Sequence, residues 1–178
     1  MENNLFNRYA IALLDLAIEE NCPHEYRSEI KVLKALIKEN EEFVRVLSCV
    51  SFSLTKKYQI IEETFKSCKV GIRNFIKIII KNNRGFFLYE ILKETLFRFD
   101  DYLLIEQGTI YSTTKLEAAE IKKISAVISK NINKDVELDN KIDESLIGGF
   151  KVILKNNIYD TSIKMQLEKM KNELVKRR

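Results

Sequence analysis

The stretch LIGGFKVILKNNIYDTSIKMQLEKMKNEL, residues 146–174, decides the fold of the C-terminal part of this chain. Gly148-Gly149 tolerates backbone angles closed to other residues and predicts a sharp turn or strand entry. From Phe150 to Lys155 apolar and polar residues mostly alternate, the two-residue period of a strand with one wet face. Asn156-Asn157 suits a tight hairpin, after which Ile158-Tyr159 is expected to return as a second strand.

A helix is expected to follow this hairpin. Asp160 is a candidate cap, because its carboxylate can accept hydrogen bonds from the first free N–H groups of a helix. Apolar residues then recur at helical spacing and form one stripe, which consists of Ile163, Leu167, Met170 and Leu174. The pattern by itself predicts a βββα packing unit and nothing more specific.

The preceding segment extends the strand-containing region upstream to about Glu106. The period changes at Glu106-Gln107-Gly108, and the β-branched and aromatic run 109–113 is strand-like. Thr114 and Glu117 have the spacing of a capping box, which would open a helix with an apolar stripe of Ile121, Ile124, Ile128 and Ile132. A further strand is expected around Val136 and Leu138. We therefore predict two domains, an N-terminal helical bundle at 1–105 and a small C-terminal α/β domain at 106–178.

The N-terminal part shows six helical patterns joined by short connections, which predicts a six-helix bundle. The expected second to fourth helices carry stripes such as Tyr26, Ile30, Leu33 and Ile37, with Asn40 as the expected cap of the third. The fifth helix, around Ile72 to Lys81, is expected to stop at Asn82–Gly85, with Gly85 suited to a left-handed end. The sixth is expected to run from about Phe86 to Ile105 and to connect the domains.

The first helix, expected from Asn3 to Glu20, has an unusually wide apolar surface. Only Arg8, Asp15 and Glu19 share a narrow polar sector, whereas apolar residues occupy most of the remaining circumference. A surface helix needs one apolar face. Either this helix lies at the centre of the bundle, or its second face docks a partner.

Composition describes a globular chain without a membrane span. Of 178 residues 46% are apolar and 31% charged, the net charge is +4 and there is one proline. No apolar run approaches the roughly 20 residues that span a bilayer. The segment MENNLFNRY lacks the pattern of a signal or transit peptide, so we expect a protein that stays in the compartment where it is made.

Catalytic, metal and cofactor motifs are absent from the sequence. It contains no GxxxxGK[ST] phosphate loop, and a catalytic triad would have to be built on the single histidine, His24. Cys22, Cys49 and Cys68 form no CxxC pair, and Cys22 with His24 makes no zinc site. We expect no enzyme activity, no catalytic residues, no cofactor and no metal.

Three binding classes remain. Nucleic-acid binding is disfavoured because lysine and arginine are interspersed with glutamate and aspartate rather than gathered in a stripe. A membrane-surface role for the first helix is disfavoured because its polar side carries too few cations. A protein–protein adaptor agrees with two dissimilar domains and surplus apolar helix surface, although a helical adaptor or a nucleic-acid-binding protein of another kind stays open from the residues alone.

Three patches in order resemble the F-type ATP synthase delta subunit family, whose mitochondrial counterpart is the oligomycin-sensitivity-conferring protein. The first is Tyr9-Ala10-Ile11-Ala12-Leu13, similar to Y-A-x-A-L in the first helix of that family. The second runs from Asn74-Phe75-Ile76 through Asn83-Arg84 to Leu88–Leu92. The third is L-I-G-G-F-x-V followed by I-x-D-x-S, which contains Gly148, Gly149, Asp160 and Ser162 as structural signature residues.

The resemblance implies a non-catalytic peripheral-stalk subunit, present in one copy per complex. Its partners would be the N-terminal helices of the alpha subunits in the catalytic head, with beta as a further candidate, and the b subunits of the stalk. Membrane attachment would come only through the complex, at the cytoplasmic face of the cell membrane. An alpha-subunit helix would lie in a groove between the first and fifth helices, for which the matching candidates are Tyr9, Ala12, Leu13, Phe75 and Ile79.

Overall fold

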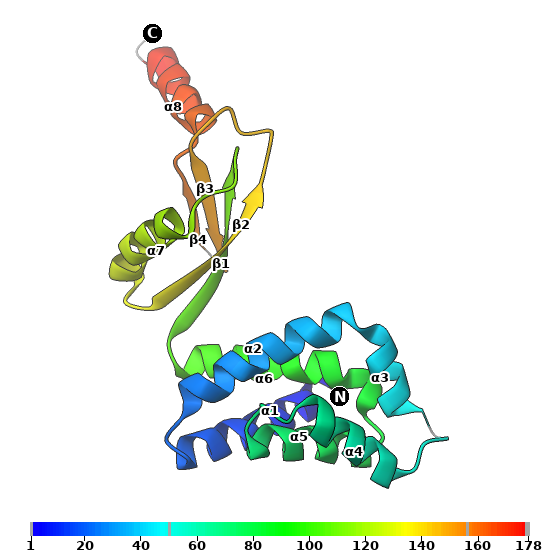
Figure 1. The fold of residues 1–178 in the computed structure, drawn as a ribbon. Coiled ribbons are helices and arrows are strands. Elements are labelled where there is room, and N and C mark those ends of the chain that lie inside the picture. The colour runs from blue at the N-terminus through cyan, green and yellow to red at the C-terminus, as the bar shows by residue number, and fades with distance from the viewer. Residues whose placement is uncertain (1, 50, 156, 177–178) are drawn as a thin grey trace. The chain divides into compact units, whose positions relative to one another are not determined.

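The computed structural model describes residues 2–49, 51–155 and 157–176. The protein is mainly helical with one small sheet of four strands, as Figure 1 shows. Contacts divide the chain into two compact units, Met1–Leu103 and Leu104–Arg178, and each unit has its own apolar core. The expected mainly helical fold with a small α/β part is confirmed.

The first unit is built from helices. They are α1 (Glu2–Glu19), α2 (Pro23–Glu39), α3 (Glu41–Ser48), α4 (Leu54–Thr64), α5 (Val70–Lys81) and α6 (Leu88–Tyr102), with a 3-10 turn at Gly85–Phe87 before α6. Helix α6 packs against both α1 and α2, and these three lie side by side in Figure 1. The apolar stripes read from the sequence supply the core, since Tyr26, Ile30, Ile72, Ile76 and Leu92 are fully buried.

A buried ion pair joins two of these helices. Arg27 Nε of α2 donates to Asp100 Oδ1 of α6 at 2.6 Å, and both side chains are about nine-tenths buried. A charge buried in this way is costly unless its partner is present. The pair therefore fixes how α2 lies against α6.

Two helix ends differ from expectation. Asn40 does not cap α3 with its side chain, because its Nδ2 donates backwards to the carbonyl of Leu36 at the end of α2. After α5 the left-handed residue is Asn83, with φ of 55°, and not Gly85. A Cβ on Gly85 would lie 2.5 Å from Ser48 Oγ, so glycine is required there for close packing against α3.

The sixth helix is shorter than predicted and is not itself the connection between the units. Helix α6 ends at Tyr102, Leu104 takes a left-handed φ of 54°, and strand β1 begins at Ile105. A left-handed residue stops an α-helix because its carbonyl and amide no longer follow the helical ladder. The apolar residues at 103–105, counted into the helix by their spacing, thus belong to a turn and a strand.

The second unit contains a mixed sheet in the order β2-β1-β3-β4. Its strands are β1 (Ile105–Ser112), β2 (Asp135–Ile142), β3 (Phe150–Leu154) and β4 (Asn157–Asp160). Strands β1 and β2 are parallel, which requires the crossover helix α7 (Ala118–Ile132), whereas β3 pairs antiparallel with β1 and with β4. The predicted antiparallel return after β3 is confirmed, although Asn156 of its expected turn lies outside the described residues.

Helix α7 covers one face of this sheet (Figure 1). The core between them contains Ile110, Ile128, Val136, Val152 and Leu154, with Ile124 and Ile132 packed against it. Gly108 lies where β1 passes between its neighbours, and a Cβ there would lie 2.3 Å from Leu154 Cδ2. Three residues of the predicted stripe of α7, Ile124, Ile128 and Ile132, therefore face the core, whereas Ile121 is not among the core residues that the structure describes.

The start of α7 lies one turn later than predicted. Glu117, and not Thr114, is the residue before the helix, and its capping-box partner is Glu120, whose Oε2 accepts from the Glu117 amide at 3.0 Å. The pair Glu117 and Glu120 has the same spacing as Thr114 and Glu117. Asn140 Oδ1 accepts from the amide of Leu116 at 3.0 Å and holds that residue in an extended connection, so the helix begins only at Ala118.

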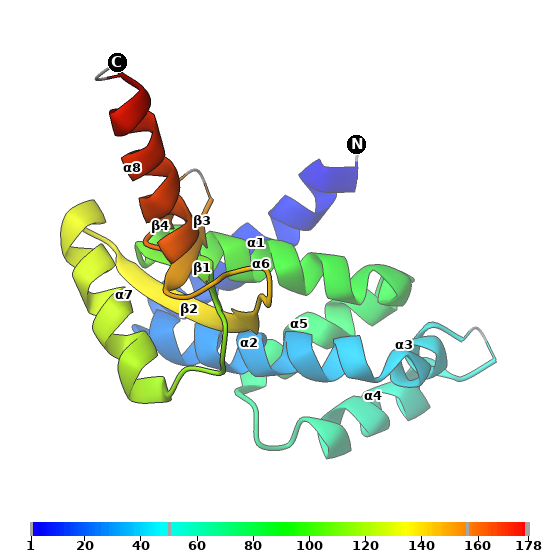
Figure 2. The ribbon, with the colours of Figure 1, turned by 90° about the horizontal axis from the view of Figure 1, so that it is seen from above.

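Helix α8 (Ile163–Lys176) differs from the expected packing unit in its burial. Ile163, Leu167 and Met170 are 42%, 54% and 61% exposed, and no residue of the stripe belongs to the described core of this unit. Figures 1 and 2 both show α8 leaving the end of the sheet rather than lying on it. The expected packing unit therefore closes without α8, whose apolar stripe faces outward; nothing is described of the Leu174 side chain.

An acid between α4 and α5 gives the first unit a predicted pH dependence. Glu62 accepts from Lys77 Nζ and Arg73 Nη1, and these cations hold the pKa of Glu62 below its usual value. Its stabilising effect is therefore complete above the unfolded-state pKa of about 4.3 and is lost as the pH falls through the lower folded-state pKa. Urea unfolding should show that Glu62→Gln destabilises at pH 7 and destabilises progressively less as the pH is lowered from about 4 to 3.

The matched control is Glu63→Gln, since Glu63 is exposed and adjacent in sequence. It should leave the unfolding free energy unchanged throughout this pH range. A Glu62→Gln penalty that stays constant from pH 7 to pH 3 contradicts the assignment.

Candidate functional site

A groove between α1 and α5 is the hollow that contains most of the predicted site residues. It has a volume of about 430 Å³, and we call it the α1–α5 groove; it is lined by Leu5, Arg8, Tyr9, Ala12, Phe75, Ile78, Asn82 and Arg84. Leu5 and Ala12 are seven residues apart on α1, so this wall extends for about 10 Å, or two helical turns. Such a length matches the apolar face of a docked helix with anchors at i, i+3 or i+4, and i+7.

Tyr9 organises one side of this groove. Its ring meets Phe75 edge to face, with centroids 6.3 Å apart, and its hydroxyl oxygen accepts from Asn82 Nδ2 at 2.8 Å and from Arg84 Nη1 at 2.5 Å. The Arg84 guanidinium carbon lies 5.5 Å from the centroid of the same ring. Tyr9 therefore connects α1 to the end of α5 and gives the groove an apolar wall with a polar, cationic rim.

The five predicted groove residues do not all reach the surface. Tyr9, Ala12 and Phe75 line the groove, and Ala12 is exposed. Leu13 and Ile79 are 2% and 0% exposed and belong to the core beneath it, so their expected place in the lining is corrected. Leu13 and Ile79 lie on the sides of α1 and α5 that face the core. Because both helices carry apolar residues on more than one side, the sequence pattern does not show which side faces the core and which faces solvent.

Sequence reasoning missed five of the lining residues, which are Leu5, Arg8, Ile78, Asn82 and Arg84. Ile78, 51% exposed, is the outward apolar residue of α5, and Leu5 begins the α1 wall. Arg8 and Arg84 supply its charge. The available signal was the excess of apolar residues on α1 and α5, since one isoleucine among Ile78, Ile79 and Ile80 has to face outward on a helix.

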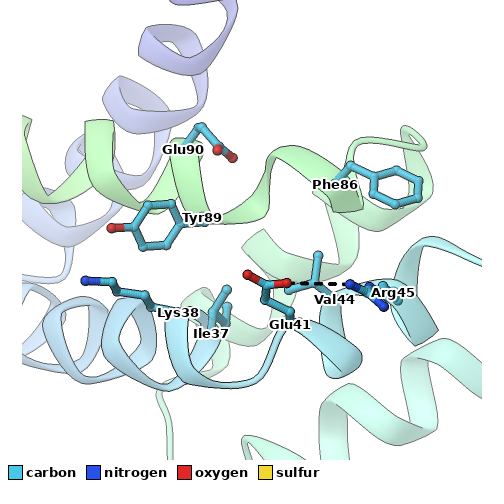
Figure 3. A pocket seen from close by; sticks show the side chains of 8 residues that line it. All are labelled: Ile37, Lys38, Glu41, Val44, Arg45, Phe86, Tyr89 and Glu90. Atoms are coloured by element: carbon cyan, nitrogen blue, oxygen red, sulfur yellow. Dashed lines mark ion pairs between the residues drawn. The ribbon is translucent and has the colours of Figure 1, made fainter.

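A second hollow lies on another side of the first unit. Figure 3 shows its lining, with Ile37 and Lys38 from α2, Glu41, Val44 and Arg45 from α3, and Phe86, Tyr89 and Glu90 beyond them, around a volume of about 360 Å³. Phe86 is 65% exposed. Glu41 and Arg45 form an exposed ion pair at 3.6 Å, and cations and acids are balanced in this lining.

The four signature residues of the C-terminal stretch meet at the start of α8. Gly149 has a φ of +79°, and a Cβ on it would lie 2.7 Å from the carbonyl oxygen of Thr161. The carbonyl of Gly148 accepts from the amide of Ile163, the first residue of α8, at 3.0 Å. These contacts confirm the predicted sharp turn and place it against the N-terminal end of α8.

The cap of α8 is Ser162 and not Asp160, a second correction at this point. The Met165 amide donates to Ser162 Oγ at 3.2 Å, whereas Asp160 Oδ1 accepts from the Ser162 amide at 2.9 Å in an Asx turn. The hydrogen bonds from the Ser162 side chain and backbone lower the pKa of the Asp160 carboxyl. Both residues therefore orient α8, one by capping it and one by shaping the turn before it.

Over the described ranges 2–49, 51–155 and 157–176, no group of three or more His, Cys, Asp and Glu side chains is placed to hold a metal ion. Within the same ranges, every helix is too short or too polar to cross a bilayer.

Comparison with known proteins decides the family. The model of the family described as ATP synthase delta (OSCP) subunit matches residues 5–174. The chain belongs to this family. The ATP synthase subunit delta of Mycoplasma mobile is 36% identical over 170 residues, covering 95% of this chain and 94% of that protein. The subunit delta of a Geobacillus species is 30% identical over 169 residues, covering 94% and 95%.

The fold is shared with a distant relative of known structure. A chain of the Toxoplasma gondii mitochondrial ATP synthase hexamer superimposes with a TM-score of 0.66 at 16% identity, covering 96% of this chain and 97% of that one. The delta (OSCP) family is one of structural, non-catalytic subunits of ATP synthase, and the interpretation of the sequence as a delta subunit is confirmed.

Proposed function

We propose that this delta-family chain is the peripheral-stalk connector that joins the catalytic head of an ATP synthase to its b-subunit stalk. Helices α1–α6 act as a six-helix bundle that holds the N-terminal helix of an alpha subunit, and the second unit, Leu104–Arg178, holds the end of the b subunits. One copy serves each complex, at the cytoplasmic face of the cell membrane, to which it is attached only through the complex. The proposed task is mechanical, because a head fixed to the stalk does not turn with the rotor.

The observation that carries the head contact is the α1–α5 groove. Its walls come from Ala12, Phe75 and Ile78, of which Ile78 is half exposed, and its length matches two turns of a helix. The small side chain of Ala12 lets a partner helix approach closely, because interaxial distance depends on the side chains at the contact. Leu13 and Ile79 support this surface from the core.

The exposed stripe of α8 supports the stalk contact. Ile163, Leu167 and Met170 lie on one face of a helix that leaves the sheet, and each is more than two-fifths exposed. Exposed apolar residues that cluster in this way mark interaction surfaces more often than single ones do. Gly148, Gly149, Asp160 and Ser162 would then act by fixing the direction in which α8 leaves the sheet.

Binding of the alpha-subunit N-terminus tests the head contact directly. A fluorescent synthetic peptide of the N-terminus of the alpha subunit from the same cell is titrated with the full-length protein, and fluorescence anisotropy reports binding. We expect saturable binding in a one-to-one ratio and a gain of peptide helicity by circular dichroism. No saturation at high micromolar protein contradicts the head contact.

A further inference from the structure

The α1–α5 groove carries a one-sided charge. Two of its lining residues are cationic, Arg8 from α1 and Arg84 from the turn after α5, and none of the lining residues that the structure describes is an aspartate or a glutamate. The second hollow is different, because its two cations face two acids and one pair of them is already joined (Figure 3). Of these two hollows, the α1–α5 groove is therefore the one that favours an anionic partner.

Arg84 is held in place at this rim rather than free to move in solvent. Its Nη1 donates to the Tyr9 hydroxyl oxygen at 2.5 Å, and its guanidinium carbon lies 5.5 Å from the Tyr9 ring centroid. Asn82 Nδ2 donates to the same hydroxyl oxygen at 2.8 Å, which fixes the phenol from a second direction. Part of the entropy that a long side chain loses on binding is thus lost before a partner arrives.

Among the residues that the structure describes, no carboxylate is paired with Arg84 or Arg8. A guanidinium has five N–H donors, and the contact with Tyr9 engages one nitrogen of Arg84. The remaining N–H donors of Arg84 can bind a carboxylate through a charge-assisted hydrogen bond. A partner can reach them because Arg84 is only half-buried.

We infer that Arg84, positioned by Tyr9 and assisted by Arg8, selects a docking helix that carries a carboxylate on the flank of its apolar stripe. This inference rests on the proposed function, since it specifies the chemistry of the helix that the α1–α5 groove holds. The apolar walls supply binding to any amphipathic helix of the right length. The Arg84–carboxylate contact sets which helix binds and in which register, because a wrong register leaves the rim cation without its acid.

The test uses two synthetic peptides and the full-length protein. One peptide is the alpha-subunit N-terminus from the same cell, and its twin has every aspartate and glutamate replaced by asparagine and glutamine. Arg84→Gln should weaken binding of the acidic peptide about fivefold and that of the amide twin less than about twofold. The acidic peptide should lose this advantage as sodium chloride is raised, because salt screens a partly exposed pair.

Two further variants separate the roles. Tyr9→Phe keeps the ring but removes the hydroxyl that holds the Arg84 guanidinium in place. If Tyr9 is a positioning residue, this variant should bind the acidic peptide about threefold more weakly and the amide twin with unchanged affinity. Arg45→Gln, in the second hollow, is the matched control and should change neither affinity. Thermal unfolding followed by circular dichroism establishes that each variant is folded.

The result that overturns the inference is an Arg84→Gln variant that binds the acidic peptide like the native protein, or that weakens both peptides equally. An alpha-subunit N-terminus without an acid beside its apolar stripe overturns it too. In these cases tight binding of the peptide still leaves the proposed function standing. If neither peptide binds the native protein, the proposed head contact and the inference fail together.

Discussion

Replacing Ala12 with tryptophan is expected to weaken binding of the alpha-subunit N-terminal peptide strongly while leaving the protein folded. Ala12 is exposed and lines the α1–α5 groove, so an indole there fills the space that a partner helix has to occupy. Loss of the central contacts of an interface costs on the order of 3 kcal/mol, which corresponds to roughly a 100-fold weaker affinity. Fluorescence anisotropy of the labelled peptide measures this loss.

The neighbouring residue provides a matched control for this variant. Ile11 is 42% exposed and lies outside the groove lining, so Ile11→Trp adds a bulky ring to the same helix without blocking the groove. It should bind the peptide as the native protein does. Equal binding by the Ala12→Trp and native proteins would place the alpha-subunit contact elsewhere on the molecule.

The second large effect is expected from the buried ion pair. Asp100→Ala leaves the Arg27 guanidinium buried without its carboxylate and should lower the free energy of unfolding of the first unit by about 3–5 kcal/mol. This is a large share of the roughly 5–15 kcal/mol that holds a domain folded. Urea unfolding followed by the helical signal in circular dichroism measures the change.

Two comparisons give this prediction its control. Glu94→Ala removes the partner of Arg98 on the same helix, and because that pair is about one-third exposed the cost should stay within about 1 kcal/mol. The double variant Arg27→Met with Asp100→Leu should be more stable than Asp100→Ala, since neither position then holds a buried charge. An Asp100→Ala protein as stable as the native one would show that the pair does not hold α2 to α6.

Apolar periodicity predicted the helices and most of the core because burial follows from spacing when one face of an element is apolar. Ile30, Ile72 and Ile128 lie where their stripes place them. Gly149 was predictable for a related reason, since a positive φ of 79° next to a close backbone contact requires glycine. Both the apolar spacing of the helices and the turn at Gly149 depend on a few residues that are close in sequence, so a local pattern is enough to predict them.

Helix ends were harder to predict because several residues at each end have the right chemistry. Asp160 and Ser162 can both cap a helix, and the choice depends on which carbonyls and amides the preceding strand leaves free. Thr114 and Glu117 present the same difficulty, which the contact of Asn140 with the Leu116 amide decides. These contacts come from strands distant in sequence, so a local pattern does not contain them.

The candidate site was predicted in part for the same reason. Tyr9, Ala12 and Phe75 were placed at the groove by resemblance to the delta family, whereas Leu13 and Ile79 lie beneath it. On α1 and α5 apolar residues cover more than one side, so spacing alone does not tell the core from the partner surface. The stripe of α8 shows the converse, because Leu167 has core periodicity and is 54% exposed.

The most direct test of the connector role is whether the protein brings its two proposed partners together. The alpha-subunit N-terminal peptide is immobilised, and a soluble b-subunit stalk fragment from the same cell is added with or without the full-length protein. We predict that the b fragment is retained only when the protein is present. With the Ala12→Trp variant, neither the variant nor the b fragment should be retained on the immobilised peptide. Retention of the b fragment without the protein, or of the protein without the b fragment, would contradict the account.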